Sequence, residues 1–364
     1  MQIKIPGKLY IGGEYAVVEP GQLAVLVAVD RFVFADIQES QFGEIMSTQL
    51  PEHVVNWTFM NDQIMIHVDS DMEFIAAALK VTYNYFKIHN WQFQPFHLVI
   101  DSQLTADNGN KFGLGSSAAV SVAIVKAILA FHQIVLPPMA QFKLAALAHY
   151  AVQKNGSLGD VATSVYTGWL SYNSPDRNWL MAQTDDLLDA TLVDQDWPEL
   201  NIQALPTPNN VQLLVGWTGT PAKTDKLVDQ VAKVAGKDTY RDFIMASQAS
   251  VAMLVNGLLA NDFDAIKRGI ALNREFLLGL SEQAHMTIET DLLKQLVEIT
   301  VAAGGAAKTS GAGFGDNGIA LINSDIDGDQ ILAQWQSAGI IPLNLHPYTE
   351  PTTITTETPE SEEA

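Results

Sequence analysis

Residues 105–131, TADNGNKFGLGSSAAVSVAIVKAILAF, join a loop of small residues to a strongly apolar segment. In this loop Gly113, Gly115, Ser116 and Ser117 leave the backbone N–H groups clear of bulky side chains. A helix that begins at Ser116 or Ser117 would direct its uncapped amides and the positive end of its dipole at one point. The stretch therefore predicts an anion site of the kind that binds nucleotide phosphates.

Two familiar phosphate loops do not fit this stretch. The P-loop needs a lysine after its last glycine, whereas Lys111 precedes the glycines here. The dinucleotide fingerprint GxGxxG needs a third glycine, and that position is Ala118. The alternative interpretation is a flexible turn, capped by serine, at the start of a core helix. The loop alone does not decide between the two.

The composition indicates a globular protein with two domains. The chain has 364 residues, of which 48% are hydrophobic and 17% are charged. It contains no cysteine, which excludes disulfides and thiolate metal sites and agrees with a reducing cytoplasm. The start, MQIKIPGKLYIGGEY, does not resemble a secretion signal. The longest apolar helical run, near 118–131, is too short to span a bilayer, so we expect a soluble cytoplasmic protein.

The net charge of −21 argues against nucleic acids and anionic membranes as partners. An acidic protein that binds polyanionic small molecules must concentrate its few cations at the site. Four lysines lie inside glycine- or threonine-rich stretches, where a merely solubilising lysine is less expected: Lys8, Lys111, Lys223 and Lys308. The sequence leaves monomer and homodimer open.

Hydrophobic periodicity predicts both strands and helices. We expect short strands at 2–5 and 8–11 around a Pro6-Gly7 turn, and a strand pair within 23–37. Helical spacing of apolar residues predicts helices over 71–89 (with Asp71 as N-cap), 143–153, 237–261, 262–280 and 290–303. The polar stretch 174–210 is interpreted as a connection that contains the domain boundary.

Two further turns carry residues that suit chemistry. In NGSLGD, residues 155–160, Asp160 is either a helix N-cap or a functional carboxylate. In KTSGAGFGDNGIALI, residues 308–322, a second glycine loop precedes a strand and is either a tight hairpin or a ligand loop. Lys8 and Glu14 flank a third glycine turn near the N-terminus.

Three of these stretches occur together in a known order. PGKLYIGGEYAVV, KFGLGSSAA and KTSGAGFGDNGIAL resemble the three motifs of the GHMP kinases. The resemblance implies an α+β fold with a domain like the second domain of ribosomal protein S5 over 1–200. A ferredoxin-like domain over 201–346 would follow. The acidic stretch 347–364, which has few large apolar residues, is expected to be a disordered tail.

The resemblance also implies roles for single residues. Catalysis would fall to Lys8, Asp160 and Lys111. ATP would be bound by Lys111, Gly113, Leu114, Gly115, Ser116 and Ser117, with Ser117 also a ligand of Mg²⁺. The acceptor would meet Lys8, Glu14, Tyr15, Ser157, Gly311, Ala312 and Gly313. Two departures stand out: Phe314 replaces a common glycine, and His149 or Gln153 lies where mevalonate kinases carry a metal-binding glutamate.

The implied activity is transfer of the γ-phosphoryl group of ATP, with Mg²⁺, to a small acceptor. Within the family the motifs look closest to the branch that acts on 5-phosphomevalonate. The alternatives are an alcohol acceptor, above all mevalonate, and a nucleotide-binding sensor without catalysis. A phosphate acceptor is mostly dianionic at pH 7, so Asp160 is expected to orient Lys8 or the metal rather than remove a proton.

Overall fold

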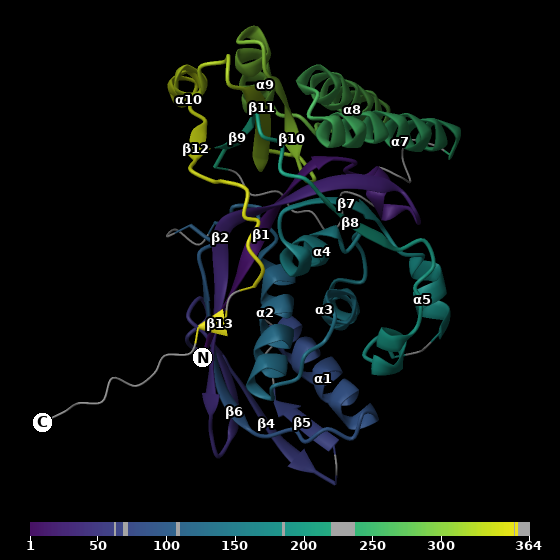
Figure 1. Ribbon diagram of the computed structural model, residues 1–364, viewed down its shortest axis with the longest axis vertical. Helices are drawn as coiled ribbons and strands as arrows, with labels where there is room; N and C mark the ends of the chain where they lie inside the picture. The colour runs from purple at the N-terminus through teal and green to yellow at the C-terminus, as the bar shows by residue number, and fades with distance from the viewer. Residues whose placement is uncertain are drawn as a thin grey trace, which may run out of the picture.

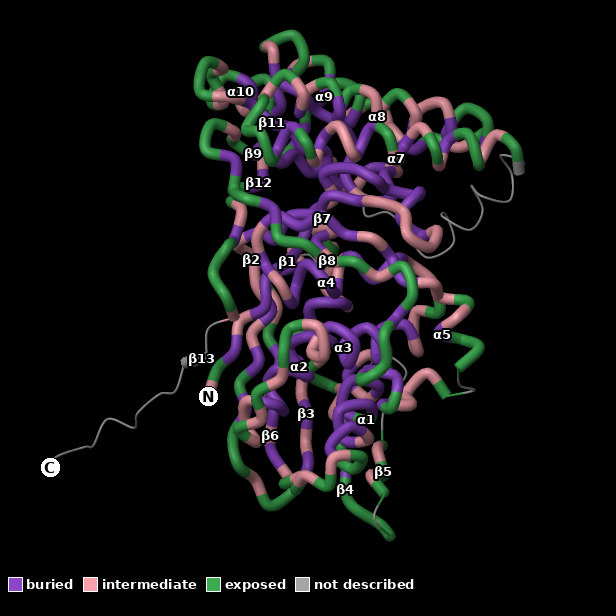
Figure 2. The backbone as a smooth tube through the Cα atoms, turned by 45° about the vertical axis from the view of Figure 1, so that its right-hand side comes forward, coloured by how far each residue is buried: buried purple, intermediate pink, exposed green. Residues whose placement is uncertain are grey.

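The computed structural model describes residues 1–61, 63–67, 72–106, 110–183, 186–219, 237–352 and 354–355. Within them, a larger sheet with its helices occupies the lower part of Figure 1 and a smaller sheet with its helices the upper part. The expected α+β class is confirmed. Figure 2 shows that buried residues continue from the lower helices through β1 and β2 into the upper part, because one apolar core spans both sheets.

The larger sheet is built around two long strands. β2 (Leu23–Glu39) pairs antiparallel with β1 (Gln2–Gly12) along its length, with β7 at its start and with β6 at its end. The strand order is β13-β1-β2-β6-β3-β4-β5; off this path, β7 pairs with β2 and β8 pairs with β7. The remaining bounds are β3 Gly43–Ser47, β4 Val54–Met60, β5 Gln63–His67, β6 Phe96–Ser102, β7 Trp169–Asn173, β8 Asn201–Leu205 and β13 Ile354–Thr355.

Among the described residues, these helices and 3₁₀ turns accompany the larger sheet: α1 Glu73–Ile88, α2 Ser116–Phe131, α3 Pro138–Gln153, α4 Gly159–Tyr166, α5 Arg177–Gln183, η1 Ala16–Val18 and η3 Ala190–Asp194. α2 contacts α1, α3, α4, β1 and β2, and this explains why it is apolar on all sides. Because α2 is enclosed in this way, its N-terminus is held at a fixed place beside β1.

The smaller sheet is antiparallel, with the order β10-β11-β9-β12. Its strands and helices are β9 Val211–Trp217, α7 Lys237–Ala260, α8 Phe263–Gln283, α9 Asp291–Ala302, β10 Ala306–Ser310, β11 Asn317–Asn323, α10 Gly328–Ser337 and β12 Ile341–Leu343. β8 pairs with β7 in the larger sheet, so that sheet continues to Leu205, beyond the expected boundary at residue 200.

The chain crosses between the sheets twice, once after β8 and once after β12. On its return, Tyr348 donates its N–H to Ala28 O (2.8 Å) and is buried. β13 then pairs with β1, with Ile354 opposite Ile3. The expectation of a disordered tail from residue 347 is therefore wrong for 347–352 and 354–355, because an aromatic anchor and backbone pairing hold them in place.

Two local expectations for the first strands are also wrong. Pro6-Gly7 is not a turn, since β1 passes through it with only a shift of register against β2. The stretch 23–37 forms one strand rather than a pair.

The helix predictions are borne out with shifted ends, and α3 begins earlier, at Pro138. Asp71, the expected N-cap, lies outside the described residues, and α1 follows Met72.

The longest apolar helix is α7, not the 118–131 segment. By length and composition alone, Asp238–Ala260 would pass for a membrane span. In the structure α7 lies against α8 and contacts β2, and Val251, Leu254 and Leu258 are buried in the main core. Its apolar character is therefore that of a core helix packed on one side.

Candidate active site

The loop Gly113–Ser117, called the phosphate loop below, has the geometry expected of an anion site. α2 begins at Ser116, and Gly115 is its N-cap with φ +78°. Ala119 N–H is the first to bond back into the helix, to Gly115 O at 3.0 Å. The preceding amides of the first turn are therefore available to a ligand, at the positive end of a buried helix.

Both glycines of the phosphate loop are needed because side chains lie directly against them. A Cβ atom at Gly115 would come within 2.9 Å of Lys8 Cε and 3.5 Å of Asp160 Cβ. A Cβ atom at Gly113, where φ is +71°, would overlap the carboxyl group of Asp316. The sequence-predicted residues Lys8 and Asp160 thus lie together at the phosphate loop.

Lys8 is held by β1 beside the loop. Its backbone N–H donates to Leu114 O (2.9 Å), and its ammonium donates to Gly113 O (3.3 Å). Burial lowers the pKa of Lys8, while the nearby charges of Asp160, Asp316 and Glu14 act in the opposite direction. A cation that is shielded from water in this way interacts strongly with any anion placed beside it.

Asp160 lies in the first turn of α4, and the turn before it is braced from three sides. Ser157 Oγ lies 2.8 Å from Tyr10 Oη and accepts the N–H of Gly159 (3.2 Å). Tyr172 Oη donates to Ser157 O. Ser157 therefore lies in the turn before Asp160, near the predicted site, but its hydroxyl is already used in bonds that hold this turn. Tyr10, two residues after Lys8, was missed.

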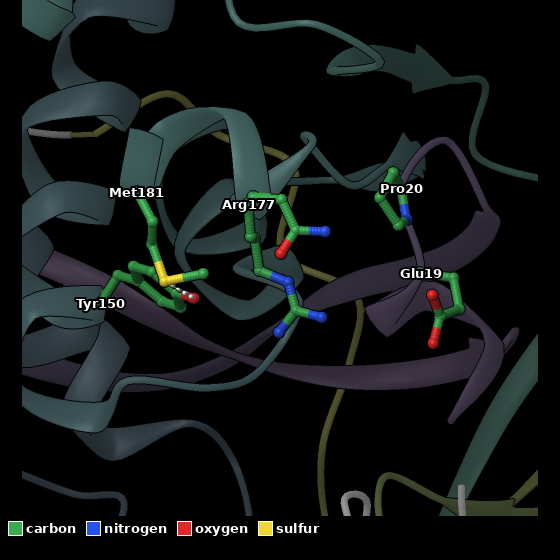
Figure 3. Close-up of a pocket in the computed structure, with 6 residues that line it drawn as sticks. Glu19, Pro20, Tyr150, Arg177 and Met181 are labelled. Atoms are coloured by element: carbon green, nitrogen blue, oxygen red, sulfur yellow. Dashed lines mark hydrogen bonds between the residues drawn. The ribbon is translucent and has the colours of Figure 1, made fainter. Parts of the chain in front are cut away.

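Arg177 is a second residue that the sequence reasoning missed, because it lies in the stretch interpreted as a connection. Its guanidinium donates to Gly156 O (3.0 Å) and to Val18 O, and so ties α5 and η1 to the turn that carries Asp160. It also borders a cavity of about 200 Å³. Figure 3 shows Arg177 between Met181 and Glu19 in this cavity, which is lined by Glu19, Pro20, Tyr150, Arg177, Asn178 and Met181.

Ser117, the expected Mg²⁺ ligand, lies in the first turn of α2. Its Oγ is 3.2 Å from Nε2 of the buried His149 on α3, one of the two candidates for the position of the missing glutamate. In the part of the chain that the structure describes, no group of three or more His, Cys, Asp or Glu residues could hold a metal. A magnesium ion at this place would need further oxygen ligands from outside the protein.

Glu14 does not face a ligand surface, contrary to expectation. It is buried in an ion pair with Lys308 of β10, which is itself fully buried and also donates to Thr309 O (2.7 Å). Burial lowers the pKa of Lys308, and Glu14 opposes that shift. Both charges are used within the protein, so neither is placed to contact phosphate groups.

The third glycine loop, Gly311–Gly313, is fixed to the larger sheet close to this ion pair. Tyr15 Oη donates to Ala312 O (2.6 Å), and Tyr10 N–H donates to Ser310 Oγ (3.1 Å). Together with the Glu14–Lys308 pair, these contacts connect the smaller sheet to the larger one. Tyr15 is buried and takes part in this connection through its hydroxyl.

Glycine is required at 313, where a Cβ atom would overlap Ile288 O, whereas no other described atom lies within 4 Å of a Cβ atom at Gly311. Phe314, the departure from the motif, has φ +60°, a conformation that favours glycine. Its N–H donates to Ile288 O (2.8 Å), and its side chain packs in the cluster around Tyr15.

Lys111, the remaining candidate that the structure describes, and two polar residues of α8 lie at the edge of the site or beyond it. Lys111 is exposed and forms a backbone β-bridge with Thr105, just before the phosphate loop. Its side chain is therefore not part of the buried cluster. Lys223 lies outside the described residues. Asn273 is fully buried and accepts the N–H of Gly13 (3.4 Å). Arg274 forms a two-pronged ion pair with Glu289 (2.7 Å).

The chain is similar to known proteins over nearly its whole length. Residues 73–168 match the family model described as GHMP kinases N terminal domain, and residues 254–341 match GHMP kinases C terminal. The phosphomevalonate kinase of Streptomyces sp. (strain CL190) is 34% identical over 365 residues, which cover 95% of this chain and 96% of that protein.

Two solved structures have similar folds over nearly their whole length. A Lin0012 protein from Listeria innocua has a TM-score of 0.90 at 34% identity, covering 98% of this chain and 99% of that one. Streptococcus pneumoniae phosphomevalonate kinase, in complex with phosphomevalonate and AMPPNP, has a TM-score of 0.82 at 29% identity, covering 96% and 100%.

Proposed function

Since this chain belongs to the GHMP kinase family, we propose that it catalyses the phosphomevalonate kinase reaction. In this reaction the γ-phosphoryl group of ATP passes to the phosphate of 5-phosphomevalonate, and ADP and 5-diphosphomevalonate are released. The structural observation that carries the proposal is the position of Lys8. Its buried ammonium lies on the phosphate loop, beside Asp160 and the open N-terminus of α2.

Charge is the main obstacle to this reaction, because both reactants are anions. Phosphoryl transfer needs in-line positioning and neutralisation of charge more than it needs covalent help from the protein. The first-turn amides of α2 bind phosphate oxygens, and Lys8 offsets the charge of the group in transfer. Burial lowers the pKa of Lys8, and the negative charge of bound phosphate groups acts in the opposite direction.

The residues present fit Mg²⁺ bound together with a nucleotide. The hydroxyl of Ser117 and the carboxylate of Asp160 are hard oxygen donors, and a magnesium ion that keeps phosphate and water ligands needs few protein ligands. When bound, Mg²⁺ neutralises phosphate charge. His149 contacts the Ser117 hydroxyl through Nε2 and so holds it in place, which distinguishes this site from one with a glutamate at the position of His149.

Asp160 serves to orient Lys8 and the metal rather than to act as a base. A phosphomonoester has a second pKa of about 6 and is already a nucleophile at pH 7. Asp160 raises the pKa of Lys8 more than any other nearby charge, so its principal effect is on that ammonium. We place the reaction in the cytoplasm with ATP and phosphomevalonate as the small-molecule partners.

The test is a comparison of acceptors with the purified protein. ADP release is measured with ATP, Mg²⁺ and either 5-phosphomevalonate or mevalonate, and we expect kcat/KM to be at least about 10³-fold higher for the phosphorylated acceptor, whose phosphate supplies the nucleophile. Equal or faster turnover of mevalonate would instead identify an alcohol kinase. ATP binding without turnover of either acceptor would indicate a nucleotide sensor.

A further inference from the structure

A second carboxyl group, that of Asp316, lies directly on the phosphate loop. Asp316 immediately precedes β11 and follows the third glycine loop in the chain. Its carbonyl accepts the N–H of Thr218 (3.2 Å), and the next residue, Asn317, donates its side-chain amide to Phe112 O. These bonds hold the start of β11 against the loop, with the Asp316 carboxyl packed on the Cα atom of Gly113.

One oxygen of this carboxyl group, Oδ1, is buried and has no hydrogen-bond partner among the described residues. Burial raises the pKa of Asp316 to about 6, although the charge of Lys8 works in the opposite direction. An ionised carboxylate without a donor is costly in such surroundings. It would also repel every phosphate group brought to the loop.

The charged groups around Asp316 come from several elements. Lys8 on β1 is the cation that acts on it, and Asp160 on α4 and Glu14 after β1 compete for the same ammonium. Lys111 is exposed at the start of the loop, and the N-terminus of α2 adds a partial positive charge. A bound phosphate group would draw Lys8 towards itself, and the balance at Asp316 would then favour the neutral acid.

We propose that Asp316 contacts the bound substrate: it takes up one proton from solvent when a phosphate ligand occupies the loop, and donates the resulting O–H to a phosphoryl oxygen. The proton returns to solvent when the ligand leaves, and no covalent bond changes. The proposal deepens the proposed function, on which it rests for the identity of the ligand. It accounts for a carboxyl group in a site for two polyanions.

The test is isothermal titration calorimetry with Mg²⁺·AMPPNP and, separately, with 5-phosphomevalonate. Each ligand is titrated at pH 7 in two buffers of different ionisation enthalpy, which gives the number of protons taken up on binding. For the ligand that contacts Asp316, the wild-type protein is expected to take up close to one proton, because a group with a pKa of about 6 is mostly ionised at pH 7.

Three variants separate the possible roles. Asp316→Asn keeps the shape and a donor but cannot titrate, so the proton uptake should fall by close to one proton relative to wild type while Kd stays within about 3-fold. Asp316→Ala removes the donor, and Kd should rise about 10-fold. Asp325→Asn, an exposed change beyond the other end of β11, should alter neither quantity. Thermal melting checks that each variant is folded.

Two outcomes would overturn the inference. The first is equal proton uptake by wild type and Asp316→Asn for both ligands. The second is a loss of affinity in Asp316→Asn that excess Mg²⁺ restores, which would identify Asp316 as a metal ligand. The calorimetry involves no turnover, so failure of the acceptor assay would count against the proposed function and leave this result standing.

Discussion

Lys8 and Lys308 are both buried lysines beside glycine loops, one on the larger sheet and the other on the smaller sheet. Among the described residues, the Lys8 ammonium donates a hydrogen bond to a backbone carbonyl of the phosphate loop and forms no ion pair with the carboxylates near it. Lys308 is closed off in an ion pair with Glu14. A buried lysine without a paired carboxylate is available to a ligand, whereas a fully paired one holds the protein together.

The largest effect is expected from Lys8→Met. The variant keeps most of the length of the side chain and removes the charge that offsets the transferred phosphoryl group, so kcat/KM should fall about 10³-fold or more. Steady-state kinetics with ATP and 5-phosphomevalonate provide the measurement. Circular dichroism should show an unchanged fold, and a loss of less than about 10-fold would remove Lys8 from the centre of the site.

Lys308→Met should act on stability rather than on chemistry. It leaves the charge of Glu14 buried without a partner, and the free energy of unfolding should fall by about 3–5 kcal/mol. Urea unfolding at pH 7 measures this loss. The double variant Glu14→Gln/Lys308→Met removes both charges and should regain part of it. If the single variant loses only about 0.5 kcal/mol, as an exposed pair would, the ion pair is not sealed from water.

The Asp316 carboxyl group should make stability depend on pH. Its pKa in the folded protein, about 6, exceeds its ordinary value of 3.8, so folding favours the neutral acid. The stabilisation of the folded protein by the neutral carboxyl group is present in full below pH 3.8 and is lost as the pH rises through 6. The free energy of unfolding of Asp316→Asn, which stays neutral, should therefore exceed that of wild type by about 3 kcal/mol at pH 8, and by less at pH 5. A gap that does not change with pH would contradict this assignment.

The smallest effect is expected from Asp160→Asn. If Asp160 orients Lys8 and the metal, its loss should lower kcat by about 10-fold, because the acceptor phosphate is already ionised. The comparison with Lys8→Met is the informative one. A collapse as large as that of Lys8→Met, with a rate that follows a single acidic group in wild type, would show that Asp160 is a general base.

The local chemistry of the site could be predicted from the sequence. Left-handed glycines and an uncapped helix start are properties of a few consecutive residues, and α2 does begin at Ser116. The place of Lys8 and Asp160 beside Gly115 came from the family resemblance, since they are 152 positions apart in the chain. The apolar composition of residues 23–37 could not distinguish one long strand from two short ones.

The contacts between distant parts of the chain could not be predicted. Lys308 and Lys8 have similar neighbours in sequence, and only the fold brings Glu14 to one of them. Asp316 was passed over because nothing in its own segment shows that its carboxyl group lies on Gly113. The same holds for Arg177, whose partners Val18 and Gly156 come from other segments.

The two crossings of the chain between the sheets limit how the molecule can move. A unit joined by one strand could swing in any direction, but the smaller sheet is connected through residues 206–210 and again through residues 344–346. Near the second crossing, His346 N–H bonds to Asp30 Oδ1 (2.7 Å) and Asp30 N–H bonds to His346 O (3.1 Å). Two attachments define an axis, so any closing of the smaller sheet against the larger one around substrates should be a rotation about the line between the two crossings.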